Sequence, residues 1–186
     1  MTLPTLPEIE QAAAAQGLLL RLQVRQILAI TTLRVVVARQ RPAQAPLLLG
    51  ELKGWALPLR DGLQLDTMRV QGPDTQGVGA LIWAATFAWA LETTPCRSAR
   101  LLAIRDNDLQ HRRLVRYFRR LGFSAIREVG AAATDLPLRL VWGGAGLLMR
   151  GDCDEGLARS WRSVTRGGFG ANTLPLNTPP QDCSPE

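Results

Sequence analysis

QGVGALIWAATFAWALE (residues 76–92) has two glycines near its start and continues as an apolar run. RYFRRLGF (residues 116–123) stands further along the chain. The run over 80–92 predicts a buried core helix. A tight glycine turn before such a helix exposes backbone N–H groups at the positive end of the helix dipole. Gly77 and Gly79 therefore fit two interpretations: a plain turn that starts a helix, or a site for an anionic group such as a phosphate.

Two other glycine motifs do not fit this stretch. A dinucleotide-binding fingerprint requires a third glycine where Ile82 stands, and it requires the first glycine directly after a strand. Here the segment 71–76 separates Val70 from Gly77. A P-loop requires Gly-Lys-Ser or Gly-Lys-Thr, and the chain contains neither sequence.

The composition is that of one globular domain. A chain of 186 residues with 46% hydrophobic residues can bury a core, and we assign residues 1–166 to this domain. Residues 167–186 are rich in Gly, Pro, Asn and Thr, and we expect them to form a disordered tail. No apolar run approaches the ~20 residues of a membrane span, and the N-terminus does not resemble a secretory signal. We expect a cytoplasmic protein that does not bind a membrane.

The net charge and the few cysteine and histidine residues indicate which ligands the chain can bind. The net charge of +6 favours anionic ligands, such as a phosphate-bearing cofactor or RNA. Three widely spaced cysteines are typical of reduced thiols, and the chain has no CxxC motif. Because His111 is the only histidine, we expect no metal site.

Strand and helix patterns predict an α/β (α+β) fold with a mixed, mostly antiparallel central sheet and helices on both faces. Asp61-Gly62 between apolar runs predicts a hairpin, and Asp106 or Asp108 can cap a basic helix that runs to Leu121. Residues 41–46, with two prolines, are expected to form a loop. The other expected helices are 5–17, 80–92 and 154–164, and the expected strands are 32–39, 47–57, 63–70, 99–105, 124–129 and 138–142.

The order of glycine turn, apolar helix, strand and basic helix ending in Leu-Gly-Phe resembles the GNAT superfamily of N-acetyltransferases, over residues 47–129. These enzymes transfer an acyl group from acyl-coenzyme A to an amine. The resemblance implies that acetyl-CoA is the co-substrate, that strand 63–70 offers main-chain groups to its pantetheine arm, and that the next strand diverges to admit it. The cofactor-binding residues so implied are Met68, Arg69, Val70, Gln76, Gly77, Val78, Gly79, Ala80 and Arg112.

Three positions depart from the family pattern. Asp74 stands where Arg or Gln is usual, His111 where Asn is frequent, and Phe118 where a Tyr commonly protonates the leaving thiolate. Phe118 shares an apolar helix stripe with Leu114, so we expect it in the core. Releasing a thiol of pKa about 8.5 unprotonated near neutral pH costs roughly 2 kcal/mol, so acyl transfer by direct attack would be slowed, not abolished. Water or His111 could supply the proton.

The catalytic base and the acceptor are less clearly indicated. Asp66 and Glu51 lie where family members often carry the carboxylate that deprotonates the amine, although both fit solvated acids on a sheet face equally well. The acceptor, a small molecule or a protein, has no signature in the sequence.

The alternative hypothesis is a GNAT-fold domain without activity that binds an acidic protein or RNA. The basic helix offers an arginine face for such a partner, although a solvated face or a contact with the 3′-phosphate of the cofactor explains it too. The arginines concerned are Arg112, Arg113, Arg116, Arg119 and Arg120.

Overall fold

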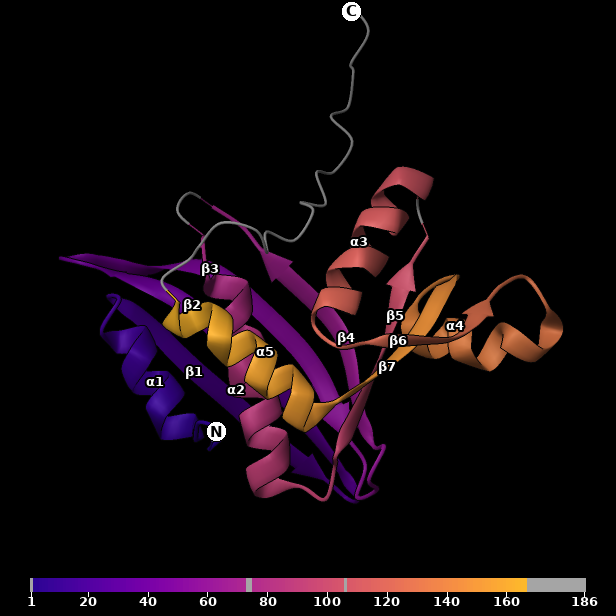
Figure 1. Ribbon diagram of the computed structural model, residues 1–186, viewed down its shortest axis with the longest axis horizontal. Helices are drawn as coiled ribbons and strands as arrows, with labels where there is room; N and C mark the ends of the chain where they lie inside the picture. The colour runs from indigo at the N-terminus through magenta and orange to yellow at the C-terminus, as the bar shows by residue number, and fades with distance from the viewer. Residues whose placement is uncertain (1, 73–74, 106, 167–186) are drawn as a thin grey trace, which may run out of the picture.

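The computed structural model describes residues 2–72, 75–105 and 107–166. The elements in chain order are α1 (Leu6–Ala14), β1 (Leu18–Ile27), β2 (Ile30–Arg41), β3 (Gln44–Ala56), β4 (Leu63–Val70), α2 (Val78–Thr93), β5 (Ser98–Ile104), α3 (Asp108–Arg120), β6 (Ser124–Val129), the 3-10 turn η1 (Ala133–Asp135), α4 (Leu136–Trp142), β7 (Gly146–Asp152) and α5 (Cys153–Thr165). One seven-stranded sheet has the order β1-β2-β3-β4-β5-β7-β6 (Figure 1). Among the described strands, only β4 and β5 are parallel neighbours, so the expected mixed, mostly antiparallel sheet is confirmed.

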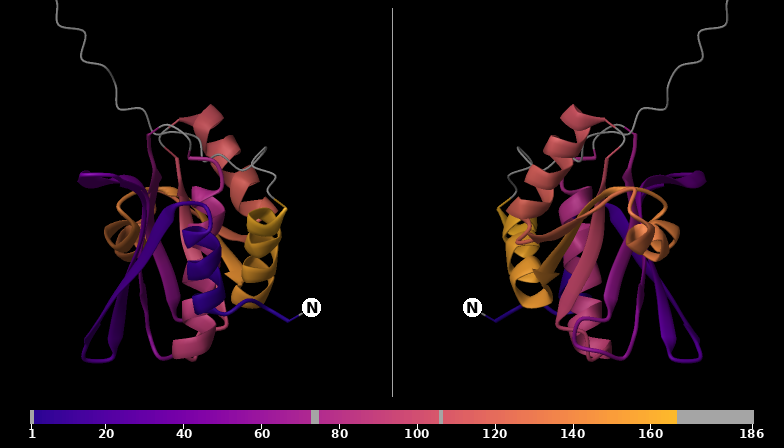
Figure 2. Two further views of the ribbon diagram at one scale, coloured as in Figure 1. Left: turned by 90° about the vertical axis from the view of Figure 1, so that its left-hand side faces the viewer. Right: turned by 90° about the vertical axis from the view of Figure 1, so that its right-hand side faces the viewer.

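Helices cover both faces of the sheet, but unequally. α1, α2 and α5 lie on one face, and α4 lies on the other (Figure 2). α2 is buried from Val78 to Ala90, because a helix that is apolar all round must be enclosed. On the opposite face, α4 packs on β5 and β7 through Trp142, which joins a small cluster with Leu102 and Leu148.

Two glycines allow α2 to approach its neighbours closely. A Cβ added to Gly50 of β3 would lie 2.9 Å from Val78 Cγ1 and 2.9 Å from Ile82 Cδ1. A Cβ added to Gly156 of α5 would lie 2.5 Å from the Phe87 ring. Real Cβ contacts are not this short, so the two glycines fix how deeply α2 sits between the sheet and α5.

The first helix begins where the sequence predicts. The Thr5 N–H donates a hydrogen bond to the Glu8 carboxylate at 2.7 Å, as in a capping box. This bond holds the pKa of Glu8 below its ordinary value. The hairpin at Asp61-Gly62 is also confirmed, because β3 and β4 pair in the antiparallel direction on either side of it.

The predicted strand 138–142 is wrong. These residues belong to α4, in which Pro137 occupies the first turn and Gly143, with φ of 74°, follows the last residue. The strand in this region is β7, which pairs with both β5 and β6. The sequence GLLMRGD of β7 has an apolar run of three residues, Leu147 to Met149, between Gly146 and the polar end Arg150-Gly151-Asp152. This run is too short to predict a strand.

Two further predictions need correction at the ends of elements. The expected loop 41–46 is a tight turn, since β2 continues to Arg41 and β3 begins at Gln44. Pro46 lies beside a register shift, where a missing ladder bond is tolerated. The cap of α3 is Asn107, whose side chain accepts a hydrogen bond from the Leu109 N–H at 2.9 Å. Asp106 and the predicted tail 167–186 lie outside the described residues.

Candidate functional site

β4 and β5 diverge soon after they begin. They pair over Leu63–Leu65 and Ala99–Leu101, and beyond these residues no ladder pair joins them in the described chain. β4 stays with β3 as far as the pair of Val70 and Gly50, whereas β5 stays with β7 as far as Ile104. The two strands therefore diverge and form a wedge in the sheet (Figure 1), and the edge of β4 that faces β5 has no ladder partner beyond Leu65 among the described residues.

A β-bulge lies at the start of the wedge. Thr67 is opposite Lys53 and Leu65 is opposite Gly54, so Asp66 is the extra residue on β4. A bulge bends its strand and increases the local twist, which accounts for the turn of β4 away from β5 at this point. The Asp66 side chain is exposed there.

The glycine turn lies at the open end of the wedge. Gly77, with φ of 72°, adopts the left-handed conformation and caps α2. Its carbonyl accepts the first helical hydrogen bond from Leu81 N–H at 2.9 Å. Gly79 and Ala80 follow in the first turn of α2, where backbone N–H groups have no intrahelical acceptor. The arrangement is suited to an anion at the helix N-terminus.

Close packing joins this turn to the end of β4. Gly50 pairs with Val70, and the missing side chain of Gly50 makes room for Val78. Of the residues implied by the resemblance, Met68, Val70, Val78, Gly79 and Ala80 thus lie in one region between β4 and α2. Arg69 points to the other face of the sheet, Gln76 is exposed in the turn, and Asp74 lies outside the described residues.

The three candidate catalytic residues do not form one constellation. Glu51 binds Arg34 through Oε2 at 2.7 Å and lies 3.9 Å from the Lys53 ammonium, so its charge is already neutralised. His111 Nδ1 donates to the Ile104 carbonyl at 3.2 Å, because a carbonyl oxygen only accepts. Among the described residues, no hydrogen bond or ion pair joins Asp66, Glu51 and His111. Asp66 is the one at the wedge.

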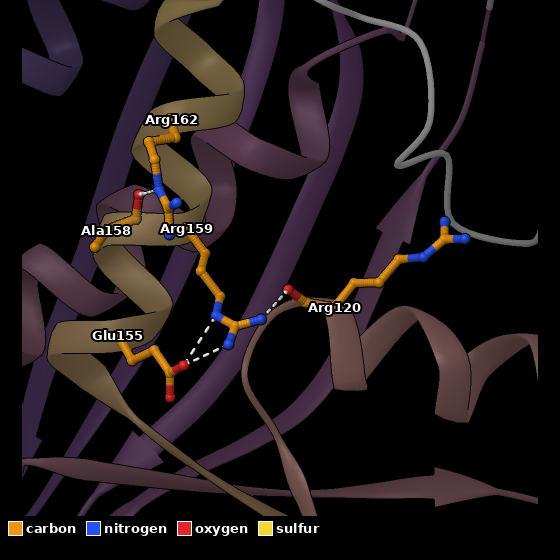
Figure 3. A network of polar contacts seen from close by, with 5 residues as sticks. All are labelled: Arg120, Glu155, Ala158, Arg159 and Arg162. Carbon is orange, nitrogen blue, oxygen red and sulfur yellow. Dashed lines mark hydrogen bonds and ion pairs between the residues drawn. The ribbon is translucent and has the colours of Figure 1, made fainter.

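His111 and Arg112 lie on α3, on the β5 side of the wedge. His111 is nearly buried and fixes the first turn of α3 to the end of β5, whereas Arg112 is exposed. The far end of α3 is fixed to α5, because Arg159 donates to the Arg120 carbonyl at 3.0 Å while it binds Glu155 (Figure 3). α3 is therefore held at both ends.

Phe118 is a core residue, as predicted. Its ring contacts Trp83 edge-on with centroids 6.2 Å apart and packs against Phe123 at 6.0 Å. Tyr117, which follows Arg116 in the sequence, is buried as well, and its hydroxyl accepts a hydrogen bond from Trp83 Nε1 at 2.8 Å. Burial raises the pKa of Tyr117 far above its ordinary value, so neither residue offers a proton to a ligand in the wedge.

Sequence reasoning missed two features of this site. Gly50 within LLLGELKG is a glycine inside a strand, a signal that another backbone or side chain approaches closely. The bulge at Asp66 has no comparable signal, because it depends on the register between β3 and β4.

No family model matches the chain, and no curated protein matches it. Among solved structures the chain is similar to a crystal structure of nourseothricin acetyltransferase, at 16% sequence identity and a TM-score of 0.46, over 74% of this chain and 88% of that one.

Within the described residues, no group of three or more His, Cys, Asp and Glu could hold a metal ion. In the same part of the chain, no helix is long and apolar enough to cross a membrane.

Proposed function

We propose that the chain is an acyl-CoA-dependent N-acyltransferase that transfers an acetyl group from acetyl-CoA to an amine by direct attack. The observation that carries the proposal is the wedge between β4 and β5 with a glycine-capped helix at its open end. A long, thin pantetheine arm joined to a diphosphate fits such a combination of an unpaired strand edge and an anion site.

Each part of the site would bind a different part of the co-substrate. The first-turn N–H groups of α2, at Gly79 and Ala80, would hold the diphosphate. The unpaired edge of β4, around Met68 and Val70, would bind the amide groups of the arm by main-chain hydrogen bonds, as an added strand does. Arg112, in the second turn of α3, would reach a further phosphate from the β5 side of the wedge.

The chemistry requires the amine to lose a proton and the thiolate to gain one while a C–N bond forms and a C–S bond breaks. Asp66 at the bulge would accept the amine proton. Water is the proton donor to the thiolate in this proposal, because Phe118 has no acidic group and the Tyr117 hydroxyl is enclosed in the core. General acid catalysis is worth ~10²–10⁴-fold, so the enzyme would be slow relative to one with a tyrosine at this position.

Calorimetric titration with acetyl-CoA tests the proposal, followed by release of free CoA in the presence of a panel of amines. Binding at or below about 1 mM, the upper end of ordinary KM values, is expected. No binding at that concentration would overturn the proposal. Gly144→Ala is a suitable control for altered glycines, because its Cβ would come no closer than 3.9 Å to Ile104 Cγ2.

A second function is favoured by the enclosed tyrosine and the exposed arginines of α3: a GNAT-fold domain that binds an acidic partner and transfers no acyl group. It would bind its partner without releasing free CoA from acetyl-CoA, whichever amine is supplied. Turnover that Gly79→Trp abolishes would exclude this alternative.

A further inference from the structure

A row of side chains crosses the entire sheet on the face that α1, α2 and α5 leave open. The residues of this row are successive register partners from β1 to β6. In spatial order they are Arg25, Thr32, Trp55, Gln64, Arg100, Arg150 and Ser124.

Two more rows follow on the same face of β1 to β4. The first contains Gln23, Arg34, Lys53 and Thr67, and the next contains Arg21, Val36, Glu51 and Arg69. Side chains on one face recur every second residue, so the rows lie about 6.6–6.8 Å apart and neighbouring strands about 4.8 Å apart.

Cations dominate this surface, which we call the arginine face. It consists of Arg21, Arg25, Arg34, Lys53, Arg69, Arg100 and Arg150. Among the described residues, three carboxylates lie within or beside it. Glu51 binds Arg34 and Lys53, Asp61 binds Arg100, and Asp66 is exposed at the bulge. Within the part of the chain that the structure describes, seven cations therefore face three carboxylates.

The arginine face is open to solvent over β1 to β4. Arg34 lies between Leu33 and Val35, which are 2% and 0% exposed on the helix side, while Arg34 itself is exposed. α4 is the one described helix on the open side, and it covers the rows of Leu102 and Leu148 further along β5 and β7 (Figure 2). No described element packs over Arg21, Arg25 or Lys53.

We propose that the arginine face docks an extended acidic segment of a protein partner. Alternate residues of an extended peptide repeat at about 6.6–6.8 Å, the same spacing as the rows. Guanidinium groups bind carboxylates in a bidentate manner, and the exposed Gln23 and half-buried Thr67 between them would supply neutral hydrogen bonds. Single-stranded nucleic acid fits less well, because base stacking uses successive aromatic rings and Trp55, half-buried, is the one aromatic residue in these three rows.

The arginine face adjoins Asp66, so a segment docked there would lie next to the proposed catalytic base. Arg69 lies on β4 itself, and the exposed Asp66 stands between the arginine face and the wedge. A bound acidic segment would bring a neighbouring lysine to Asp66. This role as acceptor rests on the proposed function, whereas the docking does not.

Docking is measured by fluorescence anisotropy with a labelled peptide of alternating Glu and Ser that carries one lysine. The control peptide has Gln in place of Glu. Binding of the acidic peptide, weakened by salt and absent for the control peptide, is expected. Arg21→Gln with Arg25→Gln should lower the affinity about tenfold, since each exposed ion pair contributes several-fold at most. The matched control is Arg116→Gln with Arg119→Gln, which removes the same charge from α3 and should change the affinity little.

Several outcomes would overturn the inference. They are no binding of the acidic peptide, equal losses in the two double variants, or tighter binding of a poly-dT oligonucleotide that depends on Arg21 and Arg25. Circular dichroism of both variants shows whether they are folded, and Lys53→Gln provides an independent substitution on the same face. Acetyl-CoA binding is titrated separately. If acetyl-CoA binds and the peptide does not, the inference fails alone; if the peptide docks and acetyl-CoA does not bind, the proposed function fails alone.

Discussion

The Trp83 indole N–H donates a hydrogen bond to the Tyr117 hydroxyl at 2.8 Å, where α2 meets α3. Both side chains are almost completely buried. The pair explains why a tyrosine next to a row of arginines points into the core: its hydroxyl satisfies the only polar atom of Trp83.

Tyr117→Phe should lower the free energy of unfolding by about 1–3 kcal/mol, because it leaves the Trp83 N–H buried without an acceptor. Urea denaturation measures the change. Adding Trp83→Phe to the Tyr117→Phe variant removes the orphaned donor, so the double variant should lose less than the sum of the two single changes. Strict additivity would contradict the importance of this hydrogen bond.

Phe118→Tyr should not increase the rate of acyl transfer. The Phe118 ring is enclosed by Trp83 and Phe123, so an added hydroxyl would lack a partner and destabilise the fold by about 1–3 kcal/mol. Unfolding in urea and release of free CoA are measured on the same preparation. A faster enzyme with unchanged stability would place this position beside the leaving thiol.

Gly50→Ala tests how the glycine turn is held against β4. Its Cβ would meet Val78 and Ile82 at 2.9 Å, which forces α2 to shift and should cost about 1–3 kcal/mol of stability. Affinity for acetyl-CoA should fall with it, because the turn moves relative to Val70. Gly144→Ala, which has space for its methyl group, is the comparison. Equal behaviour of the two variants would argue against the close approach.

The fold could be predicted well where one local signal decides the structure. The uninterrupted apolar run of α2, the β-branched TLRVVVAR of β2 and Asp61-Gly62 are examples. Prediction failed where long-range pairing decides it. LRLVW has apolar residues that suit either a strand or a short helix, and the neighbouring β7 takes the place between β5 and β6.

The residues of the candidate site likewise divide into those that a local sequence pattern indicates and those whose surroundings depend on strand register. The glycine turn is a local pattern, and the structure places Gly77 and Gly79 where the pattern predicts a helix start. Asp66, Glu51 and His111 were candidates because of their positions in the sequence, and only register separates the exposed bulge residue from the ion-paired Glu51. The rows of the arginine face need the register of all seven strands, so no sequence window contains them.

Asp135→Asn should make the stability of the protein less dependent on pH. Asp135 accepts hydrogen bonds from the Gly130 N–H at 2.7 Å and from Arg127 at 2.6 Å. The bond from Gly130 is the main reason why the pKa of Asp135 lies below its ordinary value. A lowered pKa in the folded state stabilises the protein above the unfolded-state value of about 3.9, and this contribution is lost as the pH falls through the folded-state pKa.

The measurement for Asp135 is the melting temperature of both proteins between neutral and acidic pH. Wild type should melt higher than Asp135→Asn near pH 7, and the difference should shrink as the pH falls through the lowered folded-state pKa of Asp135. A constant difference across this range would contradict the assigned hydrogen bonds.

The most direct test of the central claim is thermal stabilisation by acetyl-CoA, compared with plain CoA, for wild type and for Gly79→Trp. The account predicts that both ligands raise the melting temperature of wild type and that neither raises that of Gly79→Trp, because the bulky side chain blocks the N–H groups at the start of α2. Equal stabilisation of the two proteins, or none of wild type, would contradict the claim that the glycine-capped helix and the wedge between β4 and β5 hold an acyl-CoA.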